Sequence, residues 1–302
     1  MQLRYVIVDV FTNQRFGGNP LAVVLDAQGL SGEQMQKIAR EFNYSETTFV
    51  LPPERPGPVA TVRIFFPRNE IPFAGHPNVG TGFVIARQLH AAKGLDRLLL
   101  DEAAGTVAIE IMREGGDVKG AWMTAPQPLT IASQVSPEAF AAALNLDASD
   151  IDTSLHQPEV MTVGLPFIVA KLHSRGALRR ATPNLDKMGR LLPRDGADGV
   201  YIYTQDVDSN DGACDFSARM FAPFSGVIED AATGSATAAI AARLAMMGSE
   251  DVWEQTFAQG IDLGRPSRLA ARVTRRNGQI DLIQVGGNCV QVMQGTLDVT
   301  PD

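Results

Sequence analysis

The chain repeats itself after about half its length, and this repeat constrains the fold more than any other feature of the sequence. When residues from 219 onward are aligned without a gap on those from 63 onward, both segments show a strand, a proline, an irregular turn and a helix of small and apolar residues. Six positions carry the same residue in both copies: Arg63 and Arg219, Phe65 and Phe221, Pro67 and Pro223, Thr81 and Thr237, Ala86 and Ala242, Arg87 and Arg243. A repeat of this length in mixed strand and helix predicts two copies of one α+β unit rather than a solenoid.

The length and composition allow two such lobes. The 302 residues are 45% hydrophobic and 20% charged, as in folded globular proteins, and are numerous enough for two cores. A proline-punctuated break near residues 124–130 separates the copies. We therefore expect an N-terminal lobe at 1–127, a C-terminal lobe at 128–287, and a last strand near 288–302 as a candidate to complete the first lobe. The active site should lie in the cleft between the lobes.

The two repeated helices begin with AGHPNVGTG and DAATGSATA, which are rich in small residues. Strands can approach such a helix closely, so each lobe is predicted to be a curved, mostly antiparallel sheet or barrel around a central helix. The start of a helix has unpaired N–H groups and partial positive charge, which together suit an anion. Two helix starts that face one cleft would hold a small acidic substrate.

Local patterns predict further elements. Ser31 precedes apolar residues at helical spacing in SGEQMQKIAREF, which predicts a capped amphipathic helix. The first repeated helix is expected from about Pro77 to Leu89, and VMTVGLPFIVAKL is expected to form one strand. In the terminal hairpins, Asn277-Gly278 predicts a type I′ turn, and Gly286-Gly287 is expected to supply the next turn.

Several classes of partner and cofactor are not indicated. The net charge is -8 and no Lys/Arg cluster offers a phosphate-backbone footprint, so a nucleic-acid partner is not expected. No apolar stretch is long enough to span a membrane and the N-terminus has no signal-peptide pattern, so we expect a cytoplasmic protein. Cys214 and Cys289 lack metal-ligand spacing and are interpreted as buried apolar residues. Neither a GxxxxGKS nor a strand-linked GxGxxG phosphate motif occurs.

Six segments, spread from residue 11 to residue 267, resemble the PhzF-like, phenazine biosynthesis-type isomerases and occur in that family's order. They are FTNQRFGGNPLAVVLDA, MQKIAREFNYSETTFV, PFAGHPNVGTG, FSARMFAP, EDAATGSA and QGIDLGRPS. The resemblance implies the fold of diaminopimelate epimerase and proline racemase, with two similar lobes and the active site between them. It also implies an isomerase that acts on a small carboxylate without a cofactor or metal, usually as a homodimer.

The resemblance also implies the residues of the site. The family's acid/base glutamate falls on Glu46, its active-site histidine on His76, and its aspartate on Asp230. The candidate substrate-binding residues lie at the two helix starts and at one turn beside the cleft: Gly75, Asn78, Thr233, Gly234, Ser235 and Asn19. From the residues alone, Glu46 could instead be a surface carboxylate, His76 a helix cap, and Asp230 an N-cap.

The chain departs from the epimerases at both helix starts. Those enzymes have one cysteine at each start, whereas this chain has Ala74-Gly75-His76 and Ala231-Ala232-Thr233. A single carboxyl group can still remove a proton from one carbon and return it to another on the same face, which is an isomerisation. Glu46 would need a pKa raised by burial for this work, with Phe49, Phe73 and Phe224 as candidate walls.

Two alternatives to the isomerase hypothesis stay open at this point. Ser235, His76 and Asp230 could form the nucleophile set of a hydrolase, although Ser235 lies in TGSAT rather than in a GxSxG elbow. The chain could also be a non-catalytic protein that binds a small molecule in the same cleft.

Overall fold

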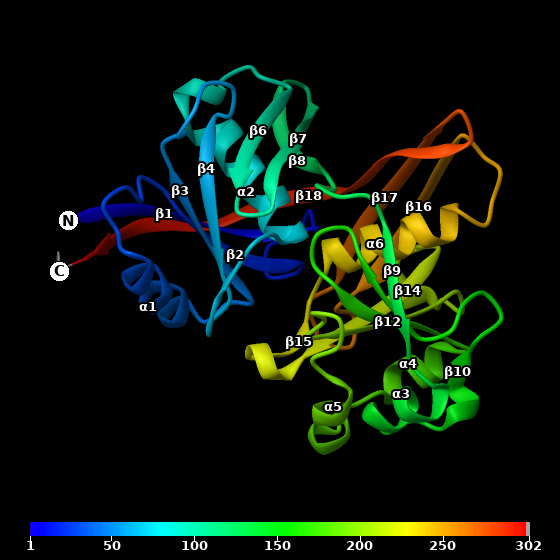
Figure 1. Ribbon diagram of the computed structural model, residues 1–302. Helices are drawn as coiled ribbons and strands as arrows, with labels where there is room; N and C mark the ends of the chain where they lie inside the picture. The colour runs from blue at the N-terminus through cyan, green and yellow to red at the C-terminus, as the bar shows by residue number, and fades with distance from the viewer. Residues whose placement is uncertain (300–302) are drawn as a thin grey trace.

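The computed structural model describes residues 1–299, except for the side chain of residue 91, and shows two lobes joined by one long strand. Figure 1 shows the first lobe in blue and cyan and the second in green to orange, with strand β18 running through both. The predicted division after residues 127 and 287 stays a prediction, and residues 300–302 of the predicted last strand lie outside the described part of the chain.

The first lobe is a closed barrel. Its strands pair in the order β18-β1-β2-β3-β4-β6-β7-β8, and β8 returns to β18. The strands are β1 (Gln2–Val10), β2 (Asn19–Val24), β3 (Glu46–Leu51), β4 (Ala60–Phe65), β5 (Glu70–Ile71), β6 (Arg97–Glu102), β7 (Gly105–Glu114) and β8 (Asp117–Thr124).

The second lobe repeats this topology. Its sheet runs β9-β11-β12-β13-β14-β16-β17-β18. The strands are β9 (Thr130–Gln134), β10 (Ile151–Asp152), β11 (Glu159–Thr162), β12 (Phe167–Leu172), β13 (Val200–Thr204), β14 (Phe216–Ala222), β15 (Val227–Asp230), β16 (Val252–Gln259), β17 (Ser267–Arg276) and β18 (Gln279–Asp298). The pairs β2–β3 and β4–β6 are parallel, as are their counterparts β12–β13 and β14–β16, whereas β3–β4 and β13–β14 are antiparallel. The predicted duplication of an α+β unit is therefore confirmed.

Three of the six shared pairs make matching contacts in the two lobes. Arg63 lies over the Phe65 ring and donates two hydrogen bonds to Glu70, and Arg219 lies over Phe221 and donates two to Glu229. Thr81 shares a hydrogen bond with Thr48 of β3, as Thr237 does with Tyr201 of β13. In both copies, the shared arginine and phenylalanine make contacts within the sheet, and the shared threonine connects the central helix to the sheet.

Each lobe has one helix at its centre. The helices are α1 (Gly32–Phe42), α2 (Gly75–Gln88), α3 (Pro137–Ala143), α4 (Arg175–Arg180), α5 (Leu185–Leu191) and α6 (Gly234–Ala245), with short 3-10 turns η1 (His90–Ala92), η2 (Ala148–Asp150), η3 (Ser209–Asp211) and η4 (Pro223–Ser225). Residues 75–86 of α2 are all buried inside the barrel, as are residues 234–242 of α6. A Cβ atom on Gly80 would lie 2.6 Å from Leu21, so the small residues do allow strands to approach closely.

The other helices cover outer faces. The predicted helix at Ser31 is confirmed as α1, with a capping box between Ser31 and Gln34. It covers a small core that includes Phe49 and Phe65, while α3, α4 and α5 cover a separate core of the second lobe. The first repeated helix begins at Gly75 rather than near Pro77, since Pro is tolerated within a first turn.

Two predictions in the strands are wrong. Gly286 and Gly287 form no turn but lie within β18, where a Cβ atom on Gly286 would meet the Trp122 ring at 2.5 Å. Glycine is needed there because β18 crosses between the lobes against β8. The segment 160–172 is two strands, because Gly164 adopts φ +146° between them. At Asn277 and Gly278, φ is positive at both residues, as the predicted type I′ turn requires.

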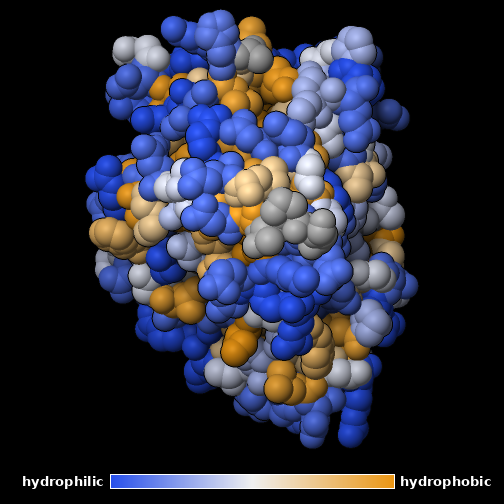
Figure 2. All heavy atoms as spheres, turned by 90° about the vertical axis from the view of Figure 1, so that its left-hand side faces the viewer, coloured by the Kyte–Doolittle hydropathy of each residue, from blue (hydrophilic) through white to orange (hydrophobic). Residues whose placement is uncertain are grey.

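Figure 2 shows the face that lies at the left of Figure 1: it is mostly hydrophilic, with hydrophobic residues in small groups between polar ones. Within residues 1–299, no helix combines the length and hydropathy that crossing a membrane would need.

Candidate active site

The starts of the two central helices touch each other. A Cβ atom on Gly75 would lie 2.4 Å from the Ser235 nitrogen and 2.8 Å from the Gly234 Cα atom, and one on Gly234 would lie 3.3 Å from the His76 nitrogen. Only glycine fits at such a contact. The predicted residues Gly75, Gly234 and Ser235 are thus brought together by the fold.

These two helix starts differ from the starts of the other α-helices. Helices α1, α3, α4 and α5 each have an N-cap side chain that accepts a backbone hydrogen bond. The N-cap residues of α2 and α6, Ala74 and Thr233, make no side-chain cap hydrogen bond. Two uncapped starts therefore turn their first N–H groups and the positive ends of their dipoles toward one place. An anion is the group that stabilises this arrangement.

Glu46, at the start of β3, is only 6% exposed, so the reading of it as a surface carboxylate is wrong. Its Oε2 atom lies 3.3 Å from His76 Nδ1 and has no hydrogen-bond partner. Burial, with a further contribution from the negative charge of Asp230, raises the pKa of Glu46 well above its usual range. An acid with a raised pKa beside a cleft is suited to carry a proton.

Asp230 ends β15, three residues before the N-cap residue of α6, so it is not an N-cap. Its carboxylate accepts hydrogen bonds from Asn19 Nδ2 at 2.8 Å and from Thr233 Oγ1 at 2.7 Å. Burial raises the pKa of Asp230 to about 6, although the hydrogen bonds from Thr233 and Asn19 oppose the shift. Glu46 from the first lobe and Asp230 from the second thus form one coupled pair of buried acids.

His76 lies in the first turn of α2 and does not cap it. Burial lowers the pKa of His76 to about 3, so the ring is neutral. His76 Nδ1 lies 3.2 Å from Asn19 Nδ2, whose two hydrogens go to Asp230 and Ala232, and 3.3 Å from Glu46 Oε2. His76 Nε2 is buried and makes no hydrogen bond in good geometry with the described residues.

Asn19 joins the two lobes. Its Nδ2 atom donates to Asp230 and to the Ala232 carbonyl, both in the second lobe, and its Oδ1 atom accepts from Ser45. Since these contacts occupy the Asn19 amide, its predicted binding of substrate stays a prediction. Asn78 and Thr233 are also buried at the helix starts, where Asn78 donates to the Ala74 carbonyl and Thr233 to Asp230.

The sequence analysis missed Ser45 and Gln259. Gln259 accepts from the Thr233 backbone N–H and donates to the Asp230 carbonyl, so it fixes the turn before α6. Both residues lie within segments that carry the family resemblance, which is the one signal that could have found them.

The predicted aromatic walls are not where they were expected. Side chains alternate along β3, so Glu46 and Val50 point toward α2 while Phe49 points to the core under α1. Phe224 is 44% exposed, next to Gly189 of α5, and Phe73 is buried against Gly164.

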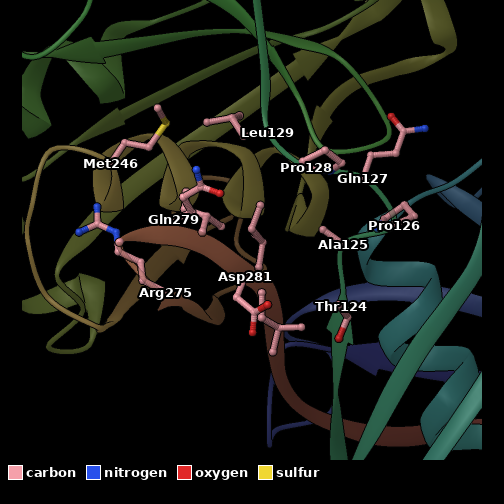
Figure 3. Close-up of a pocket in the computed structure, with 14 residues that line it drawn as sticks. Thr124, Ala125, Pro126, Gln127, Pro128, Leu129, Met246, Arg275, Gln279 and Asp281 are labelled. Carbon is pink, nitrogen blue, oxygen red and sulfur yellow. The ribbon is translucent and has the colours of Figure 1, made fainter.

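A cavity of about 540 Å³ leads from solvent to this site. Asn19, Ser45 and Asp230 form its polar side, and Tyr44, Ile228 and Leu263 are among the larger side chains around it. A second cavity, of about 530 Å³, lies between residues 124–129 and 278–283 (Figure 3). There Arg275 donates to the Gly248 and Ala245 carbonyls at the end of α6, and Asp281 forms an ion pair with Arg276. Both charged side chains that line this cavity therefore have partners within the protein.

Arg265 clamps the lobes together beside the first cavity. It donates to Asp9 Oδ1 at 2.5 Å and to the carbonyls of Gly17 and Gly18 at 2.7 and 2.8 Å, in the turn that leads into Asn19. We expect Arg265→Ala to lower the free energy of unfolding by about 3 kcal/mol, because it leaves the buried Asp9 carboxylate without its ion-pair partner. Urea denaturation measures this loss. Asp9→Asn in the same chain should recover part of it, and a purely additive double variant would contradict the pairing.

The hydrolase set is not assembled. His76 Nδ1 faces Asn19 and Glu46, and Nε2 has no partner, so Ser235 is not hydrogen-bonded to the His76 ring. Neither cysteine lies at a helix start, and burial raises the pKa of both Cys214 and Cys289, which disfavours their thiolates.

Comparison with known proteins identifies the family. The model of the phenazine biosynthesis-like (PhzC-PhzF) family matches residues 8–295. The trans-2,3-dihydro-3-hydroxyanthranilate isomerase of Pseudomonas chlororaphis is 38% identical over 297 residues, which cover 97% of this chain and 98% of the relative.

Solved structures show the same fold. A PhzF-family phenazine biosynthesis protein of Bacillus anthracis superposes with a TM-score of 0.86 at 24% identity, covering 99% of this chain and 100% of that one. A hydroxyproline epimerase from Agrobacterium vitis superposes with a TM-score of 0.63 at 14% identity, covering 98% and 91%, and supports the fold alone. This chain belongs to the phenazine biosynthesis-like, or PhzF-like, family, and it is an isomerase.

Proposed function

We propose that this isomerase moves a proton within a small, cyclic or unsaturated carboxylic acid, with Glu46 as the proton carrier and without a cofactor. One observation carries the proposal: a buried acid with a raised pKa lies beside His76 and is coupled to Asp230, at the place where two uncapped helix starts meet. In this account the substrate carboxylate binds to the first N–H groups of α2 and α6.

The proton moves along one face of the substrate. At neutral pH the Glu46–Asp230 pair holds one proton, on Glu46, because the pKa of Glu46 is raised and that of Asp230 is about 6. Glu46 delivers its proton to one carbon and removes another proton from a second carbon, so the pair has the same number of protons before and after a turnover. The neutral His76 donates its ring proton to an oxygen on which negative charge develops.

The substrate class is proposed from the relatives. The trans-2,3-dihydro-3-hydroxyanthranilate named for the Pseudomonas chlororaphis enzyme has a carboxylate, an amino group and a hydroxyl group on one ring. The two helix starts suit the carboxylate, and the ionised Asp230 suits a hydroxyl or amino donor. The test is to supply this compound, beside other small carboxylates, and to follow its conversion by chromatography; no conversion of any of them would reject the proposal. The homodimer implied by the resemblance stays a prediction.

The pH profile tests the coupled pair. We expect kcat/KM to fall on the acid side near pH 6, where Asp230 becomes protonated, and on the alkaline side, where Glu46 loses its proton. In Asp230→Asn the acid limb should disappear. The alkaline limb should move to lower pH, because the negative charge that helps to raise the pKa of Glu46 is gone. An unchanged alkaline limb in Asp230→Asn would argue against the coupling.

A further inference from the structure

A third acid, half-buried but with an enclosed carboxyl group, lies near the helix starts, outside the catalytic set. Glu102 ends β6, and Leu98 and Leu100, the alternate residues of that strand, are fully buried. Both carboxyl oxygens of Glu102 are enclosed and have no hydrogen-bond partner in good geometry. An outer cavity of about 490 Å³ reaches the residue, but these two oxygens are shielded from it.

The polar side chain close enough to hydrogen-bond with the Glu102 carboxyl is that of Asn78, in the first turn of α2. Asn78 is completely buried, and its Oδ1 atom also has no partner. One hydrogen of its Nδ2 atom goes to the carbonyl of Ala74 at 2.9 Å, which leaves the other for the Glu102 carboxyl. That second hydrogen can satisfy only one carboxyl oxygen and leaves Asn78 Oδ1 without a donor, whereas a proton on the carboxyl supplies one.

Burial raises the pKa of Glu102 well above its usual range, although the nearby Asn78 side chain opposes the shift. A neutral carboxyl can donate its O–H to Asn78 Oδ1, which otherwise has no partner among the described residues. Asn78 then connects Glu102 to Ala74, the N-cap residue of α2. Ala74 immediately precedes Gly75, whose backbone lies against Gly234 and Ser235.

We propose that Glu102, as a neutral carboxylic acid, is a positioning residue that acts through Asn78 to hold the start of α2 against the start of α6. The inference rests on the proposed function in one respect only: that this junction binds the substrate carboxylate. Residue 102 lies outside the segments that carry the family resemblance, so the role is argued from the buried oxygens alone.

Hydrogen exchange tests the positioning without any ligand. Glu102→Ala should speed exchange of the amides at the start of α2 by about tenfold or more, because the turn loses its support. Glu102→Gln keeps a donor for Asn78 Oδ1 and should exchange like the parent. Glu114→Ala, on the exposed end of β7, is the matched control and should leave this segment unchanged. Equal exchange in Glu102→Ala and the parent would overturn the proposal, as would a Glu102→Gln variant that exchanges as fast as Glu102→Ala.

The affinity of the protein for a carboxylate ligand tests whether Glu102 affects substrate binding at the helix starts. Anthranilate is the probe, since it has the carboxylate and amino group of the relative's substrate. Glu102→Ala should weaken its binding by about tenfold while kcat changes by less than about threefold, because a carboxylate contact is the same in the ground state and the transition state. Adding Asn78→Ala to Glu102→Ala should cost no more than Asn78→Ala alone, as expected for residues that act in one chain. Additive losses, or a loss in kcat instead of affinity, would contradict the mechanism.

Infrared spectroscopy tests the protonation state separately. In the Glu46→Gln protein, at a pH well above the pKa of about 6 for Asp230, one protonated-carboxyl C=O band should remain and should vanish in Glu46→Gln/Glu102→Gln. Absence of that band would overturn the neutral acid. Hydrogen exchange and infrared spectroscopy need no turnover, so failure of the proposed function leaves both interpretable.

Discussion

Glu46→Gln is expected to lower kcat by about 10³-fold, because glutamine fills the same space but can neither deliver nor accept the proton. Glu46 is buried beside His76, and the residues that would form the binding site, the starts of α2 and α6, are untouched by the change. Affinity for the substrate or for anthranilate should therefore stay within about threefold of the parent.

Steady-state kinetics measures the loss in kcat, and calorimetric titration measures the affinity. Glu41→Gln, an exposed glutamate near the end of α1, is the matched control and should behave like the parent. A Glu46→Gln enzyme that keeps more than about a tenth of the parent kcat would remove Glu46 from the role of sole proton carrier.

Gly75→Ala should lower kcat/KM by about 10²-fold, because the added methyl group must displace the start of α6. Its Cβ atom would lie 2.4 Å from the Ser235 nitrogen and 2.6 Å from the Gly234 carbonyl carbon, both backbone atoms with little room to yield. The two N–H clusters would move apart, and a carboxylate could no longer contact both.

The control for this variant is Gly189→Ala, within α5, where the new Cβ atom would lie 3.7 Å from the Phe224 ring. That change should leave kcat/KM unchanged and stabilise the helix slightly. Circular dichroism of both variants checks that the barrels remain folded. Parent-like kcat/KM in Gly75→Ala would show that contact between the helix starts is not needed for binding.

The part of the fold that could be predicted from the sequence is its duplication into two similar lobes. The shared arginine and phenylalanine of each copy identified the duplication, because in both lobes they make the same contacts within the sheet. A last strand near 288–302 was expected in the first lobe, but the continuous course of β18 through both lobes was not, since it depends on pairing with β17, β8 and β1 together. Pairing with β8 and β1, which are far away in sequence, has no local pattern, and Gly286-Gly287 looked like a turn for this reason.

The site was predicted through the family resemblance more than through local chemistry. Local patterns allowed Asp230 to be an N-cap and Phe49 to be a wall of the cleft, and both interpretations are wrong. The side of a strand on which a residue lies depends on its neighbours in the barrel, which for β3 are α1 on one face and α2 on the other. For the same reason, local patterns did not identify Ser45, Gln259 and Glu102 as site residues: their partners are far away in sequence.

The most direct test of the account follows the migrating hydrogen. Converting the protiated substrate in heavy water, over many turnovers, and weighing the product by mass spectrometry shows whether one carrier passes the substrate's proton on. Glu46 takes up the substrate's proton at the end of one turnover and delivers it in the next, so a buried carrier predicts that part of the product has protium at its newly protonated carbon. Glu46→Gln should form no such product. Complete replacement by deuterium in the parent, with conversion undiminished in Glu46→Gln, would contradict the account.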